Sequence, residues 1–163
     1  MTVYYVNIYD VNLLATVPVG CRARPARKNQ VDTSRIDLSA DLVAAMDSAP
    51  SALHCIAESD GLAVMLYVGG EVDMANAETW RWLLAEVAAM TPAPGQLIVD
   101  VNGLEFVGIG AYRDLVEQAH RCRQRGIALC LVSRQSIVAR VVEICGWDVE
   151  LPLYSHLDQV LVS

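Results

Sequence analysis

The sequence lacks the patterns of a membrane protein, a secreted disulfide scaffold or a zinc site. Its longest apolar runs, such as LAVMLYV and IALCLV, fall far short of the roughly 20 residues that a membrane-spanning helix needs. The five cysteines are an odd number and include no CxxC pair, so neither a disulfide framework nor a zinc cage is indicated. The N-terminus shows no basic start and no small-residue cleavage site of a secretory signal. We therefore expect a cytoplasmic protein.

The chain is also poor in groups that perform catalysis. It contains no GxGxxG or GxxxxGK[ST] nucleotide fingerprint and no GxSxG nucleophile elbow. The histidines, His54, His120 and His156, are far apart, and none has the HxxxH spacing of metal ligands. We expect no catalytic residues, no metal site and no cofactor, and we interpret the protein as a non-enzyme.

Acidic side chains outnumber basic ones in residues 51–163, where the pattern of strands and helices is most regular. The formal net charge is −7, and residues 1–50, with five basic and five acidic side chains, contribute none of it. An acidic domain does not favour nucleic acid, whose phosphates attract lysine and arginine. The short basic cluster CRARPARK contains Pro25 and is typical of a solvated linker.

What the sequence does contain is a regular alternation of strands and helices. ALHCIAE and LAVMLYVGG are joined by the turn signal SDG and predict a hairpin. Apolar residues then recur at helical spacing after Asp73, which we predict to be the helix N-cap, and QLIVDV and IALCLV are typical of buried strands. Further helices are predicted over 109–125, 133–146 and 155–162. The order predicts an α/β sandwich with a mixed sheet of four to five strands and about four helices.

Residues 1–50 differ from the rest and are predicted to be an N-terminal extension to a domain of residues 51–163. Within the extension, residues 1–20 have some strand character, the basic loop follows, and a short amphipathic helix precedes Pro50.

Three segments stand above this background: GGEVDMAN, NGLEFVGIGAY and the tail RGIALCLVSRQSIVARVVEICGWD. In order and spacing they resemble the STAS domain of anti-sigma factor antagonists, over about residues 52–162. Members show a Gly-Glu-hydrophobic-Asp motif, which Gly70 to Asp73 match. A strand with a hydrophobic-Asp-hydrophobic pattern follows, here with Asp100, and a G-L-x-F approach leads to a turn of the type Asp-Ser-Ser-Gly. The tryptophans and the tail favour the actinobacterial versions.

The turn itself departs from the family pattern. In members that are switched, a kinase phosphorylates the second hydroxyl residue, at a helix N-terminus where free amides tolerate an anion. Here the turn reads Gly108, Ile109, Gly110 and Ala111, so Gly110 occupies the phosphoacceptor position and cannot accept a phosphate. The resemblance thus implies a binding surface without its usual switch.

The resemblance implies a function as an anti-sigma factor antagonist. The partner would be an anti-sigma factor of the histidine-kinase-like ATPase type, and its capture would release a sigma factor for transcription. The predicted contact surface comprises Glu71, Asp73, Asn76, Gly108, Ile109, Gly110, Ala111 and Tyr112. Control would come from expression level, from the extension or from redox chemistry at Cys145.

Two other hypotheses stay open. Related domains sense ligands or nucleotides. The glycine turn lies at a predicted helix N-terminus, where free backbone N–H groups favour binding of an anion. Alternatively, the apolar segment 1–20 pairs between chains and makes the protein a scaffold subunit or homodimer. Neither hypothesis involves nucleic acid or a membrane.

Overall fold

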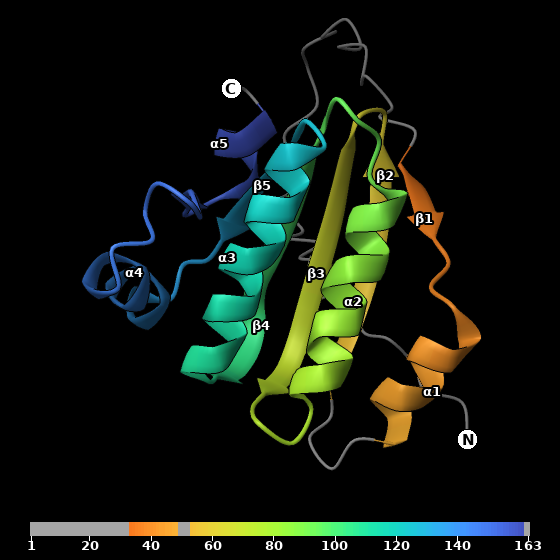
Figure 1. The fold of residues 1–163 in the computed structure, drawn as a ribbon, viewed down its shortest axis with the longest axis horizontal. Coiled ribbons are helices and arrows are strands. Elements are labelled where there is room, and N and C mark those ends of the chain that lie inside the picture. Colours follow the sequence, from red (N-terminus) through yellow and green to blue (C-terminus); the bar gives the residue numbers. More distant parts are fainter. Residues whose placement is uncertain (1–32, 49–52, 162–163) are drawn as a thin grey trace, which may run out of the picture. The chain divides into compact units, whose positions relative to one another are not determined.

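A six-stranded mixed sheet in the order β1-β2-β3-β4-β5-β6 forms the centre of the fold in a computed structural model that describes residues 33–48 and 53–161 (Figure 1). The strands are β1 (Ser34–Ile36), β2 (His54–Asp60), β3 (Ala63–Val72), β4 (Gly95–Val107), β5 (Ile127–Val132) and β6 (Leu153–Tyr154). β1, β2 and β3 pair antiparallel, whereas β3 to β6 run parallel. The predicted hairpin is confirmed as β2 and β3, with Gly61 at φ +58° in its turn.

Five helices accompany the sheet in the described residues: α1 (Ala40–Ser48), α2 (Ala77–Met90), α3 (Ile109–Gln124), α4 (Ser136–Ile144) and α5 (Leu157–Leu161). The α/β class and the mixed sheet are confirmed. The predicted counts of four to five strands and about four helices are too low. β1 and β6 were not predicted, because they are edge strands of three and two residues and are too short to show an alternating pattern.

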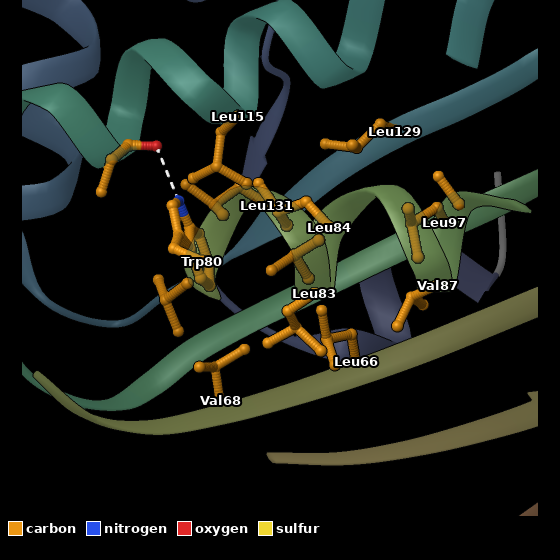
Figure 2. Close-up of a cluster of buried hydrophobic side chains, with 14 of the residues drawn as sticks. Leu66, Val68, Trp80, Leu83, Leu84, Val87, Leu97, Leu115, Leu129 and Leu131 are labelled. Carbon is orange, nitrogen blue, oxygen red and sulfur yellow. Dashed lines mark hydrogen bonds between the residues drawn. The ribbon is translucent and has the colours of Figure 1, made fainter. Parts of the chain in front are cut away.

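The two faces of the sheet bury different side chains. Alternate residues of β3, β4 and β5, such as Leu66, Leu97 and Leu131, face α2 and α3, which lie side by side over this face (Figure 1). Trp80 of α2 is fully buried within this cluster (Figure 2). The opposite face buries Met65, Ile98, Cys130 and Val132 together with Val160 of α5. Coverage on both faces explains why these strands read as continuous apolar runs.

Helix α1 belongs to this core although it lies within the first 50 residues. Its Leu42 is fully buried and Met46 nearly so, both within the main hydrophobic cluster. Ser39, just before the helix, donates its backbone N–H and its hydroxyl to the Glu86 carboxylate of α2, at 2.6 and 2.7 Å. The predicted strand character of residues 1–20, the basic loop and Cys21 lie outside the described residues.

Replacing Leu42 by alanine tests whether α1 is an integral part of the fold. We expect Leu42→Ala to lower the free energy of unfolding by about 2–5 kcal/mol, because it removes a fully buried side chain and leaves a cavity. Val43→Ala is the matched control on the same helix. Val43 is 40% exposed, so its truncation should change stability by no more than about 0.5 kcal/mol. Equal effects of the two substitutions in urea denaturation would contradict the packing of α1.

Candidate functional site

The candidate site lies where the parallel strands β3 and β4 end together. Their registry pairs Glu71 with Phe106 and Val72 with Val107. Immediately beyond, the Gly108 N–H donates to the Val72 carbonyl at 2.8 Å, and α3 begins at Ile109. This bond holds the first of the three sequence motifs, at the end of β3, against the second, at the start of α3. Carboxyl ends of neighbouring parallel strands are common binding positions in α/β proteins.

Two glycines allow the strands to reach this arrangement. A Cβ at Gly103 would lie 2.8 Å from the Val68 carbonyl oxygen and 3.2 Å from the Cα of Gly69, so only glycine permits this close approach of β4 to β3. Gly70 adopts φ +95°, between two irregularities in the pairing of β3 with β4. Gly70 and Gly103 therefore serve the backbone of the site.

Asn76 organises the loop between β3 and α2. Its Oδ1 accepts the Asp73 N–H at 3.0 Å, and its Nδ2 donates to the Glu71 carbonyl at 2.8 Å. The prediction that Asp73 caps α2 is wrong, because the helix begins at Ala77 and Asn76 occupies the N-cap position. The Asp73 carboxylate instead accepts the Ala75 N–H at 2.8 Å and closes a local turn. The loop is therefore fixed by side-chain bonds to its own backbone.

A buried contact joins α2 to the start of α3. The Trp80 indole N–H donates to the Ala111 carbonyl at 3.2 Å, the dashed line in Figure 2. Farther along, Arg81 lies 3.8 Å from Asp114. Burial raises the pKa of the Asp114 carboxyl above its ordinary value, although the nearby Arg81 acts to lower it. These contacts join the start of α2 to the start of α3 beneath the exposed part of the site.

The exposed part of the site is largely apolar. We call it the motif surface and define it as Glu71, Asp73, Met74, Phe106, Gly108, Ile109 and Gly110. Met74 is 96% exposed, Phe106 53% and Ile109 58%. A Cβ built on Gly108 would lie 3.8 Å from both the Phe106 ring and the Cα of Asp73, which places these three residues in contact distance.

Three of the predicted partner-binding residues lie beneath this surface rather than on it. Asn76 is 2% exposed, Ala111 5% and Tyr112 3%. Their side chains can support the surface that a partner would contact, but they cannot form much of that surface. The predicted partner contacts of the other members stay predictions; of these, Glu71, Ile109 and Gly110 are exposed, and Asp73 and Gly108 are half-buried.

Sequence reasoning missed Met74 and Phe106 as candidate contacts. Both lie inside motifs that were singled out, but each was passed over in favour of its charged or glycine neighbours. The sequence did contain a signal that Met74 is exposed. It is an apolar residue inside a loop that follows a strand, and such a residue has no core position to fill. Exposed large apolar side chains grouped in one place are typical of protein interaction sites.

The start of α3 has room for the side chains that the motif lacks. Among the described residues, a Cβ at Gly110 would meet nothing within 4 Å, and one at Gly108 would make only ordinary contacts of 3.5 Å or longer. No side chain in the described part of the chain caps this helix, and its first turn contains no acidic residue. The absence of hydroxyls at this turn therefore does not follow from a steric requirement of the fold.

The described cysteines fall into two groups. Burial raises the pKa of the Cys55 thiol to about 11 and that of Cys130 to about 12, which disfavours the reactive thiolate in both. Cys145, at the end of α4, is exposed, and its redox role stays a prediction. In the described part of the chain, no three His, Cys, Asp or Glu side chains form a cluster suited to a metal ion. Nor does any described helix combine the length and the apolar character needed to cross a membrane.

Comparisons with known proteins agree with this geometry. A sequence model of the STAS domain matches residues 55–160. A protein of Mycobacterium tuberculosis (strain ATCC 25618 / H37Rv) named "Putative anti-anti-sigma factor Rv2638" is 45% identical over 124 residues, covering 76% of this chain and 84% of its own. The anti-sigma-F factor antagonist RsfA of M. tuberculosis (strain CDC 1551 / Oshkosh) is 40% identical over 111 residues, covering 68% and 87%.

A solved structure gives the same result. The crystal structure of an anti-sigma factor antagonist from Mycobacterium paratuberculosis superposes with a TM-score of 0.62 at 27% identity, covering 71% of this chain and 96% of that one. The sequence motifs, the sheet and these similarities agree: the chain belongs to the STAS domain family.

Proposed function

We propose that this protein is an anti-sigma factor antagonist, which binds an anti-sigma factor through the motif surface and so frees a sigma factor for transcription. The observation that carries the proposal is the group of exposed apolar side chains, Met74, Phe106 and Ile109, at the fixed junction of β3, β4 and α3. Relatives at 40% identity carry the name of anti-sigma factor antagonist, which supports the same function for this chain.

The partner is an anti-sigma factor of the histidine-kinase-like ATPase type, and the complex forms in the cytoplasm. An apolar contact surface supports a binding role, because burial of Ile109 and Phe106 against a partner stabilises a complex without desolvating a polar group. The protein itself acts without catalysis, since the motif surface contains acidic and apolar groups but no nucleophile paired with a base.

Binding is not controlled by phosphorylation at the helix start. Gly110 stands where switched members have their hydroxyl acceptor, and glycine has no side-chain atom to modify. The open space around Gly110 supports the idea that a hydroxyl was lost without structural need. The antagonist is then active whenever it is present, and its amount sets its effect.

Ile109→Asp tests the contact surface. We expect it to raise the Kd for the cognate anti-sigma factor at least about a hundredfold, because complex formation would bury an unpaired carboxylate. Isothermal titration calorimetry measures the change. The matched control is Leu62→Asp, also at an exposed apolar residue (62%), but at the opposite end of the ten-residue strand β3, about 30 Å away. Equal losses in both variants, or none in Ile109→Asp, would contradict the assignment of the surface.

The missing switch can be restored by substitution. We expect the double variant Gly108→Asp/Gly110→Ser to fold normally, because both side chains have space, and to become phosphorylated by a kinase-active anti-sigma factor with ATP. Phosphorylation should then release it from the complex. The control Gly108→Asp/Gly110→Ala occupies the same space without a hydroxyl and should stay bound, as should the wild type. Mass spectrometry and gel filtration after ATP addition give both readouts, and ATP-dependent release of the wild type would refute the loss of the switch.

A further inference from the structure

The last part of β4 has no strand beside it on its β5 side among the described residues. β4 pairs with β5 from Gly95 and Ile127 to Asp100 and Val132, where β5 ends. β4 itself continues to Val107, and within the described part of the chain this last stretch pairs only with β3. Residues 101–107 therefore need other partners for the backbone groups that point away from β3.

Gln135 supplies such a partner. It is the N-cap residue of α4, yet its side chain makes no cap bond and reaches back to β4 instead. Its Nε2 lies 2.8 Å from the Leu104 carbonyl oxygen, and 3.3 and 3.4 Å from those of Asn102 and Val101. All three partners are carbonyl oxygens, which accept hydrogen bonds. The side-chain amide of Gln135 therefore turns its NH₂ group, and not its oxygen, toward β4.

A second set of hydrogen bonds also connects the start of α4 to β4. The Arg134 backbone N–H donates to Asn102 Oδ1 at 2.7 Å. Asn102 in turn donates its backbone N–H and its Nδ2 to Asp100 Oδ1, at 2.9 and 2.8 Å. The start of α4 is thereby hydrogen-bonded to β4 just beyond Asp100, where the pairing of β4 with β5 ends.

The segment held in this way leads directly into the motif surface, since it contains Phe106 and is followed by Gly108 and Ile109. We infer that Gln135 is a positioning residue for partner binding: its side chain replaces the missing strand and fixes residues 101–107, and with them Phe106, in the geometry that an anti-sigma factor recognises. The inference rests on the proposed function for its partner. Gln135 is half-buried and not part of the motif surface, so it acts through β4 rather than by contact.

Gln135→Met tests the inference, because methionine has a similar length but no N–H to donate. Amide hydrogen exchange of the free protein should become at least about tenfold faster in residues 102–107, with exchange in β5 (127–132) unchanged as the internal control. The Kd for the anti-sigma factor should rise about tenfold. The neighbouring Ser136→Ala, which removes an exposed side chain without a bond to β4, should change neither value. If Gln135→Met does not fold, Asn102→Ala removes the second connection and should give the same local acceleration.

The outcomes separate the inference from the function on which it rests. Unchanged exchange in 102–107 overturns the inference whether or not a partner binds. Faster exchange with an unaltered Kd shows that the bonds hold β4 but do not position the contact surface, which also overturns it. Uniformly faster exchange, including β5, means a general loss of stability and overturns it as well. Failure of the wild type to bind any cognate anti-sigma factor refutes the proposed function and with it the partner half of the inference.

Discussion

The hydrogen bond from the Gly108 N–H to the Val72 carbonyl is the interaction on which the candidate site depends. It fastens the start of α3 to the end of β3 and brings together two sequence motifs that are more than thirty positions apart. The other features of the site support this junction. Gly103 lets β4 approach β3 closely, Asn76 fixes the loop that follows β3, and Trp80 ties α2 to the first turn of α3. A rigid backbone at this point allows a few exposed apolar side chains to present a defined contact surface.

The chemistry of the surface follows from the residues at the turn where α3 begins. In a switched antagonist the turn must accommodate both a free hydroxyl and a phosphate, so it carries polar groups that a partner has to desolvate. In this chain the same positions hold glycine, isoleucine and alanine. In the proposed complex, binding depends on apolar burial, which phosphorylation at this turn would not reverse. Under the proposed function, an antagonist of this kind responds to its own abundance and to events elsewhere in the chain.

The sequence predicted the parts of the fold that have strong local patterns. The β2–β3 hairpin, the buried runs of β4 and β5 and the helical face of α3 were all visible in period and turn chemistry. β1 and β6 were not, because strands this short are defined by their pairing partners. Asp73 was mistaken for a helix cap since sequence does not reveal that the loop runs three residues further to Asn76.

The candidate site was predicted as a region more accurately than as a set of side chains. Motif resemblance located both segments, and the fold brings them together. Which residues face solvent depends on tertiary packing. Tyr112 illustrates this, because its spacing of three and seven residues from Leu115 and Ala119 places it on the buried face of α3, although it lies within the motif. Gln135 gave no local signal, since its partners are backbone carbonyls more than thirty positions away.

The proposed function requires an anti-sigma factor to contact this protein at the junction of β3, β4 and α3. Amide NMR spectra of the isotopically labelled protein, recorded with and without the purified cognate anti-sigma factor, test it most directly. We expect the resonances of residues 71–76 and 105–111 to shift or broaden first, while those of the β2–β3 turn around Gly61 stay unchanged. Perturbation centred on the β2–β3 turn, or on α4 and α5 with residues 105–111 unaffected, would contradict it.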